Sequence, residues 1–200
     1  MNIAGTSIGP GRPTFIIAEM SGNHNHDFAR AKKIIDMAAY AGVDAVKLQT
    51  YTPDTMTIKS DKKWFTVGKG NAWEGTTLYD LYQWAHTPWA WQKRLMAYAK
   101  KKGLVCFSTP FDETAVDFLE GLDVPAYKVA SFEIADLELL ARIGKTRKPV
   151  ILSRGLATLP EIRKAVDTLK RHGAPEVAVL HCVSSYPAAP AQMNLATIPD

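Results

Sequence analysis

Six short apolar runs alternate along the chain with segments that carry a helical pattern. Each run is almost continuously apolar, which indicates strands covered on both faces, as in a parallel sheet. The runs cover residues 14–20, 44–50, 104–109, 126–131, 149–154 and 176–182. This order of strands and helices predicts an α/β fold, either an open doubly wound sheet or a (β/α)8 barrel.

Helical patterns fill most of the intervals between the runs. The expected helices cover 27–41, 88–102, 112–120, 134–143 and 158–172. Gly42 and Gly144 are stop signals after two of these helices, and Thr158 is the expected N-cap of the last. Residues 51–87, rich in Trp, Tyr, Thr and Gly, form a long insertion after the second strand. Long insertions at this position are usually functional.

Composition and charge exclude several classes of protein. The 200 residues suffice for one domain or a large part of one. No apolar run approaches the roughly 20 residues that span a bilayer, and the first residues lack the pattern of a secretory signal. Cys106 and Cys182 lie in apolar runs, so we expect buried thiols and a cytoplasmic protein. The net charge of +4 is modest and the basic residues are scattered, which leaves room for a small anionic substrate but does not indicate nucleic acid. The short apolar runs give no reason to expect a membrane as partner.

Polar side chains recur where the apolar runs end. In a barrel, the carboxyl ends of the strands and the loops that follow them build the active site. Serines or threonines stand at or just after the ends of the last four runs, two runs contain a lysine, and acidic residues, an arginine and a tyrosine stand near these ends. Together the polar residues are Glu19, Lys47, Ser108, Thr109, Lys128, Ser131, Glu133, Ser153, Arg154, Ser184, Ser185 and Tyr186.

The two lysines are the most informative of these residues. Lys47 and Lys128 stand in runs that are covered on both faces, and a buried ammonium group needs an anion. A structural pair of Lys47 with Glu19, or of Lys128 with Glu133, would satisfy either lysine alone. Both lysines together favour a ligand that carries phosphate and carboxylate groups.

The stretch IIAEMSGNHNHD (16–27) invites interpretation as a metal site. A barrel would divide it: Glu19 lies at the strand end, Gly22 to His24 form a turn, and the last residues enter the first helix. The glycine there does not belong to a G-x-G-x-x-G nucleotide motif. A nucleophilic pair of Cys182 with His181 is disfavoured, because neighbours in a strand face opposite sides.

Seven segments together resemble the sialic acid synthase family, and most of all its pseudaminic acid synthase branch. The segments are IIAEMSGNHN, VKLQTYTPDTMT, NAWEGTTLYDLYQWAHTPWAW, GLVCFSTPFDETAVDFLE, YKVASFEIADLELL, VILSRGLATLPEI and LHCVSSYPAAP. The resemblance runs from about residue 8 to residue 200 and implies a (β/α)8 TIM barrel, of which about six β/α units lie in this chain.

The resemblance implies an enzyme that forms carbon–carbon bonds. The family condenses phosphoenolpyruvate with an N-acetylated amino sugar to a nine-carbon 2-keto sugar acid and releases phosphate. A divalent metal, Mn²⁺ or Mg²⁺, polarises the aldehyde of the open-chain sugar. A Schiff-base pyruvate aldolase on the same barrel, and an inactive fragment that acts only as a partner of a complete synthase, are the alternatives.

The resemblance also assigns roles to residues of this chain. Glu19 and Glu133 match acidic, catalytic positions near the sugar and the reacting carbons. The positions that match phosphoenolpyruvate-binding residues are Lys47, Lys128, Ser131, Ser153, Ser185 and Tyr186. Arg154 departs from the family, which usually has a small hydroxyl residue there, and its role stays open. Ser185 replaces a frequent asparagine.

The chain is shorter than the family pattern requires. The family's two metal-binding histidines belong to motifs on strands 7 and 8, and neither motif occurs in residues 1–200, so no metal ligand is assigned within them. We expect the metal ligands, both strands and a C-terminal antifreeze-like domain beyond residue 200. The full-length protein is expected to be a homodimer, and this chain alone to be inactive.

Overall fold

The computed structural model describes residues 1–70, 73–185 and 188–198. The chain divides into two compact units, one of residues 15–115 and one that joins residues 1–14 to residues 116–200. We call them the 15–115 unit and the 116–200 unit. Each unit contains parallel strands that are connected through helices, so the α/β class expected from the sequence is confirmed.

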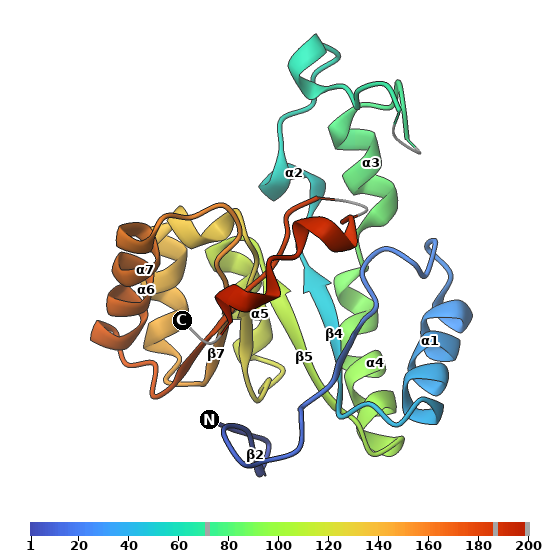
Figure 1. The fold of residues 1–200 in the computed structure, drawn as a ribbon. Helices are drawn as coiled ribbons and strands as arrows, with labels where there is room; N and C mark the ends of the chain where they lie inside the picture. Colours follow the sequence, from blue (N-terminus) through green and yellow to red (C-terminus); the bar gives the residue numbers. More distant parts are fainter. Residues whose placement is uncertain (71–72, 186–187, 199–200) are drawn as a thin grey trace. The chain divides into compact units, whose positions relative to one another are not determined.

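The 15–115 unit contains three parallel strands in chain order. They are β3 (Ile17–Glu19), β4 (Ala45–Thr50) and β5 (Val105–Pro110), and each begins within three residues of its expected start. Helices α1 (Phe28–Tyr40) and α4 (Trp89–Lys101) pack side by side against β4, as Figure 1 shows. Ile35, Leu48 and Leu95 are fully buried between these elements. The parallel pairing brings the carboxyl ends of the three strands to one edge.

Helix α1 begins where the sequence predicted a helix entry. The carboxylate of Asp27 accepts hydrogen bonds from the backbone N–H groups of Ala29 (2.8 Å) and Arg30 (3.3 Å). Such caps satisfy donors that have no partner within the helix. Gly42 follows the helix with a φ of +74°, the left-handed conformation that glycine adopts without strain.

The insertion after β4 has secondary structure of its own. It contains the helices α2 (Pro53–Met56) and α3 (Leu78–Ala85) and the 3₁₀ turn η1 (Lys63–Phe65). Thr77 caps α3 through a hydrogen bond from the N–H of Asp80 (3.1 Å). The hydroxyl of Tyr79 donates to Asp54 (3.0 Å), which joins α3 to α2. The insertion is therefore a folded segment and not an open loop.

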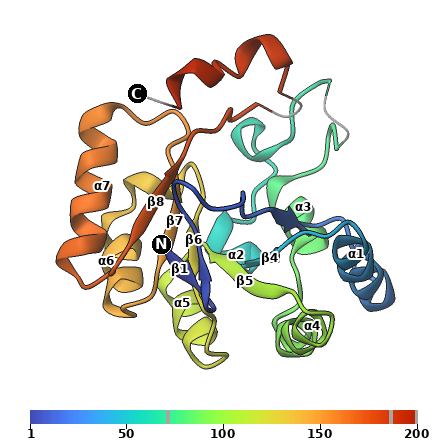
Figure 2. The same ribbon diagram turned by 60° about the horizontal axis from the view of Figure 1, so that its bottom comes forward.

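The 116–200 unit repeats the strand–helix pattern. Its parallel strands are β6 (Tyr127–Val129), β7 (Val150–Ser153) and β8 (Val177–Leu180), and its helices α6 (Leu137–Lys145) and α7 (Leu159–Arg171) pack together (Figure 2). Helix α5 (Glu113–Glu120) spans the boundary between the units. The short turns are η2 (Glu133–Ala135), η3 (Pro190–Gln192) and η4 (Leu195–Thr197). The sequence did not predict the antiparallel hairpin of β1 (Asn2–Ile3) and β2 (Thr6–Ser7).

One predicted helix end is wrong. Helix α6 continues through Gly144 to Lys145. A Cβ atom at Gly144 would lie 2.7 Å from the carbonyl oxygen of Leu169 and 2.8 Å from Cβ of His172, both at the end of α7. Gly144 is thus a point of close approach between two helices. The expected N-cap of α7 is confirmed, because the carboxylate of Glu161 accepts from the N–H of Thr158 (2.7 Å).

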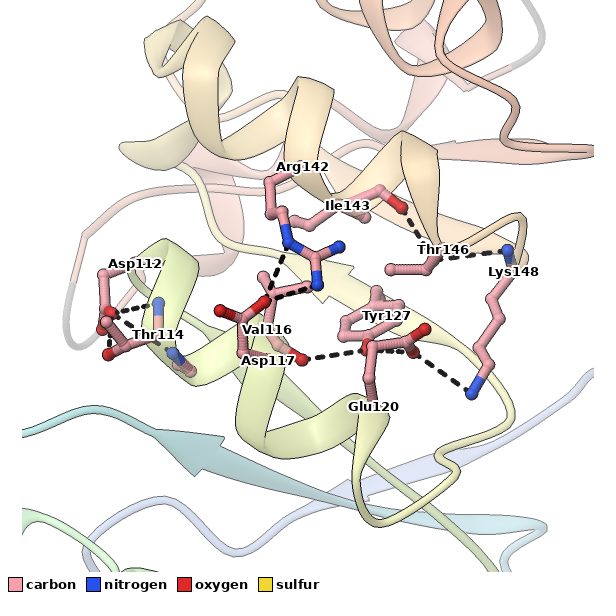
Figure 3. A network of polar contacts seen from close by, with 11 residues as sticks. Asp112, Thr114, Val116, Asp117, Glu120, Tyr127, Arg142, Ile143, Thr146 and Lys148 are labelled. Atoms are coloured by element: carbon pink, nitrogen blue, oxygen red, sulfur yellow. Dashed lines mark hydrogen bonds and ion pairs between the residues drawn. The ribbon is translucent and has the colours of Figure 1, made fainter.

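A polar network joins α5, β6 and α6 within the 116–200 unit (Figure 3). The hydroxyl of buried Tyr127 donates to the carboxylate of Glu120 (2.7 Å), which also pairs with the ammonium of Lys148 (3.2 Å). Arg142 of α6 pairs with Asp117 of α5. These groups satisfy one another, so the network has a structural role.

Candidate active site

Lys47 of β4 and Glu19 at the carboxyl end of β3 form an ion pair in which only the lysine is buried. Lys47 is 6% exposed, and its Nζ lies 3.3 Å from a carboxylate oxygen of Glu19, its register partner on β3. Nζ also donates to the hydroxyl of Thr109 on β5 (3.4 Å). Burial lowers the pKa of Lys47, and the charge of Glu19 raises it. Of the alternatives left open by the sequence, the structural pair with Glu19 is formed, while the Glu19 side chain stays 61% exposed.

The hydroxyl groups beside this pair have fixed roles. Thr50 donates to the amide oxygen of Gln92 (2.8 Å) and lies 2.7 Å from the hydroxyl of Ser108. A hydroxyl has a single proton, so Ser108 is the donor in the second bond. All three side chains are buried. Ser108 therefore has only lone pairs to offer and is not placed to donate to an anion.

The turn between β3 and α1 is held by a buried histidine. His24 is fully buried, its Nδ1 lies 3.0 Å from the N–H of His26, and its Nε2 lies 3.0 Å from the hydroxyl of Thr87. An N–H needs an acceptor, so the proton of the neutral ring sits on Nε2. Burial, with His26 and His86 nearby, lowers the pKa of His24 to about 4. The predicted turn is confirmed and His26 is exposed, but the burial of His24 was missed.

The second lysine lies in the 116–200 unit. Lys128 is 6% exposed on β6, and its Nζ donates to the hydroxyl of Ser153 on β7 and to the carbonyl of Val129 (2.7 Å). Ser153 accepts this bond, which leaves its own proton available to a further acceptor. The strands β6 and β7 thus place a cation and a hydroxyl donor together, as an anion site requires.

A sulfur atom lies beside this pair. The Sγ of half-buried Cys182 accepts a hydrogen bond from the N–H of Gly155 (3.2 Å) and lies 3.6 Å from the hydroxyl of Ser131. Burial raises the pKa of Cys182, but hydrogen bonds from Ser131, Gly155 and Ser153 and the charge of Lys128 outweigh burial and lower it. The sequence placed Cys182 inside a strand as a small buried residue. It instead lies two residues after β8 and makes polar contacts, so that interpretation was incomplete.

Glu133 is the acidic group of the 116–200 unit that matches a catalytic position. One of its carboxylate oxygens is buried and makes no hydrogen bond to any described residue. Burial raises the pKa of Glu133, and the charge of Lys128 lowers it less. A raised pKa makes this carboxyl group easier to protonate than an exposed glutamate, which suits a group that exchanges a proton.

The remaining candidates follow β8 and β7. Ser185 is exposed, and Tyr186 lies outside the described residues. The guanidinium of Arg154 donates through Nε (3.1 Å) and Nη2 (2.9 Å) to Nδ1 of His181, whose Nε2 lies 2.7 Å from the carbonyl of Met193. Arg154 therefore contacts His181.

A metal site is not formed by the described residues. Within 1–70, 73–185 and 188–198, no three His, Cys, Asp or Glu side chains are placed to hold an ion. Residues 16–27, which the sequence offered as a metal site, are divided between the end of β3, a turn and the cap of α1, as the barrel interpretation predicted; Asp27 is in the cap. In the same ranges, no helix has the length and apolar character needed to cross a membrane.

The structure brings together some of the expected site residues. Glu19 contacts Lys47 in one unit, and Lys128 contacts Ser153 in the other, with Ser131 joined to the same cluster through Cys182. Their roles in binding and catalysis stay predictions. Sequence reasoning missed Cys182 and Gly155. The signal that could have indicated them is their position: Gly155 lies two residues after β7 and Cys182 two residues after β8, where neighbouring parallel strands end at one edge.

Comparison with known proteins adds the family. A model of the NeuB family matches residues 34–200. Pseudaminic acid synthase of Campylobacter jejuni is 44% identical over 184 residues, which cover 92% of this chain and 53% of that protein. The Helicobacter pylori pseudaminic acid synthase is 43% identical and is covered to 54%. The chain therefore spans about half the length of the curated relatives it matches.

A solved structure agrees with these relatives. N-acetylneuraminic acid synthetase of Leptospira borgpetersenii matches with a TM-score of 0.85 and 33% identity, over 100% of this chain and 64% of that one. This match confirms the predicted fold class, a (β/α)8 TIM barrel present as an incomplete barrel of about six β/α units. The chain belongs to the NeuB family, and its matched relatives include pseudaminic and sialic acid synthases.

Proposed function

We propose that the whole protein condenses phosphoenolpyruvate with an N-acetylated amino sugar to a nine-carbon 2-keto sugar acid and releases phosphate. The observation that carries the proposal is the cluster around Lys128, in which a buried ammonium and the hydroxyl of Ser153 meet at the ends of neighbouring strands. Fixed cations and hydroxyl donors hold an anionic substrate in one orientation. Relatives named as synthases of pseudaminic and N-acetylneuraminic acid support it.

The proposed reaction balances as follows. The C2–C3 double bond of phosphoenolpyruvate supplies the electron pair with which carbon 3 attacks the aldehyde carbon of the open-chain sugar. A carbon–carbon bond forms, and the aldehyde oxygen takes up a proton and becomes a hydroxyl. Water adds at carbon 2 and loses its protons, the carbon–oxygen bond to phosphate breaks, and carbon 2 becomes a ketone. Lys128, Ser131 and Ser153 would hold the phosphate and carboxylate groups. Glu133, whose pKa is raised by burial, would take up or give a proton.

Two groups have proposed roles that rest on the family resemblance. Lys47 would serve substrate binding and Glu19 catalysis, and Ser185 and Tyr186 would contact phosphoenolpyruvate.

The described residues offer no ligand set for Mn²⁺ or Mg²⁺, so no step here is assigned to a metal. We propose that its ligands lie on strands 7 and 8, beyond residue 200. A homodimer with a C-terminal antifreeze-like domain, acting in the cytoplasm, completes the proposal.

The decisive experiment uses the full-length protein. It is incubated with phosphoenolpyruvate, Mn²⁺ and a panel of 2-acetamido and 2,4-diacetamido hexoses, and phosphate release is measured. We expect release with a 2,4-diacetamido sugar, as the pseudaminate relatives suggest. The proposal fails if no sugar on the panel stimulates release. Residues 1–200 alone are expected to be inactive in the same assay.

A Schiff-base pyruvate aldolase is a second candidate, because burial lowers the pKa of Lys47. A less basic amine is a better nucleophile near neutral pH. The ion pair with Glu19 opposes this role, since it stabilises the ammonium form. Borohydride treatment with pyruvate separates the two candidates: a covalent adduct on Lys47 or Lys128 supports the aldolase, and an unmodified protein supports the synthase.

A further inference from the structure

We infer that Cys182 is a positioning residue of the proposed anion site: its sulfur fixes the hydroxyl of Ser131 and the turn at Gly155. The inference rests on the proposed function, because Ser131 is expected to bind phosphoenolpyruvate. All three residues belong to the 116–200 unit.

The sulfur joins the ends of three strands. Cys182 lies two residues after β8, Gly155 two residues after β7, and Ser131 two residues after β6. The N–H of Gly155 donates to Sγ (3.2 Å), and the hydroxyl of Ser131 lies 3.6 Å from Sγ. A sulfur acceptor tolerates these longer distances, which a hydroxyl oxygen with its shorter bond to Cβ would not span as well.

Gly155 is held directly against Ser131. Its φ is +51°, a conformation that other residues adopt only with strain. A Cβ atom at this position would lie 2.6 Å from Cβ of Ser131 and 3.1 Å from its hydroxyl oxygen. The turn after β7 and the turn after β6 are therefore in contact, and the sulfur of Cys182 bonds to both.

The sulfur can act as donor or acceptor in these contacts. Gly155 donates to it, and in the contact with Ser131 either group can be the donor. A thiol that donates to the oxygen of Ser131 leaves the hydroxyl proton free for an anion, and the position of the oxygen is set before substrate binds, which reduces the cost of ordering the site. A thiolate would instead accept from Ser131: burial raises the pKa of Cys182, but hydrogen bonds from Ser131, Gly155 and Ser153 to the thiolate outweigh burial.

The first arm of the test does not depend on catalysis. The rate of iodoacetamide modification of Cys182 is measured against pH by mass spectrometry in the full-length protein and in Ser131→Ala. We expect the pKa from this profile to rise in Ser131→Ala, because the thiolate loses a donor. Cys106, buried in β5 with a pKa raised to about 12, is the internal reference and should stay unmodified. An unchanged profile overturns the inference.

The second arm uses steady-state kinetics. We expect Cys182→Ala to raise KM for phosphoenolpyruvate about tenfold, corresponding to about 1.4 kcal/mol, with little change in KM for the sugar. Cys182→Ser should recover part of the loss, because a hydroxyl still accepts from Gly155. Cys106→Ala is the matched control, with both KM values unchanged. If Cys182→Ala changes only the melting temperature, the sulfur has a structural role and the inference is wrong.

The two proposals fail in distinguishable ways. A wild-type protein that releases no phosphate with any sugar contradicts the proposed function. The alkylation profile then still decides whether Cys182 and Ser131 are coupled. A wild-type protein that is active, with Cys182→Ala unchanged in KM for phosphoenolpyruvate, contradicts only the positioning role.

Discussion

Nε2 of His24 lies 3.0 Å from the hydroxyl of Thr87, and the ring fixes the turn after β3 to the start of α4. A second contact of the ring depends on its neutral form, because Nδ1 accepts from the backbone N–H of His26 (3.0 Å). A proton on Nδ1 would remove that acceptor. Trp91 of α4 packs edge-on against the same ring at 5.7 Å between centroids. The loop that follows Glu19 is therefore sensitive to acid.

We predict that the protein loses stability between pH 6.5 and pH 4 in part through His24. The pKa of His24 is lowered from 6.5 to about 4, so the folded state binds fewer protons than the unfolded state within this window. The free energy of unfolding must then fall as pH falls, by up to about 1.4 kcal/mol per pH unit for one group. Urea unfolding of wild type and His24→Gln across this range measures the difference.

Two results decide that prediction. The pH dependence should be flatter in His24→Gln than in wild type. His26 and His86 lower the pKa of His24 through their own charges, so they belong to the same transition. Parallel curves for wild type and His24→Gln would contradict the role given to this ring.

We predict that Glu19→Gln makes Lys47 more reactive. Burial already lowers the pKa of Lys47, and the charge of Glu19 is what raises it. Without that charge, a larger fraction of the lysine is neutral at pH 7–8, so its acetylation by acetic anhydride should be faster. The exposed Lys164 is the internal reference for mass spectrometry. Because the Glu19 side chain is 61% exposed, the stability loss should be small, about 1 kcal/mol or less. Equal rates for Lys47 in both proteins would show that the pair is not formed in solution.

Much of this fold could be predicted because its strands and helices carry strong local signals. Each of the six apolar runs coincides with a strand to within a few residues, the N-cap Thr158 stands where the sequence placed it, and Asp27 lies at the expected entry to the first helix. The hairpin at residues 2–7 was missed because two strands of two residues have no detectable period. Gly144 was misjudged because its close approach to Leu169 depends on the packing of α6 against α7, which no local pattern encodes.

The sequence predicted those residues of the candidate site whose burial alone demands a partner, but not those that are brought together by the alignment of strand ends. A lysine in a buried strand demands a partner, and this reasoning identified both Lys47 and Lys128 together with the alternative partner Glu19. The position of Cys182 depends on how three strand ends align in space. Its contacts with Gly155 and Ser131 join residues 27 and 51 positions away, and sequence periodicity carries no information at that range.

We predict that Tyr127→Phe lowers the free energy of unfolding by about 1 kcal/mol, the usual loss for a hydrogen bond. The ring of Tyr127 is fully buried, and its hydroxyl donates to Glu120 at 2.7 Å (Figure 3). Glu120 keeps its ion pair with Lys148, so the carboxylate is not left alone. Tyr40→Phe, at a residue that is 87% exposed, is the matched control and should be neutral. Chemical denaturation of both variants checks this; equal stabilities of Tyr127→Phe and wild type would mean that the bond contributes nothing.

We predict that Gly155→Ala is more destabilising than Gly103→Ala, although both glycines have a positive φ. Gly103 has a φ of +80° and no heavy atom within 4 Å of an added Cβ, so alanine there costs only backbone strain, about 1 kcal/mol. At Gly155 the added Cβ would lie 2.6 Å from Cβ of Ser131, so the turns after β6 and β7 must separate. Thermal unfolding compares the two variants, and a larger loss for Gly155→Ala is expected. Equal losses would show that Ser131 moves aside freely, and that the contact does not hold it in place.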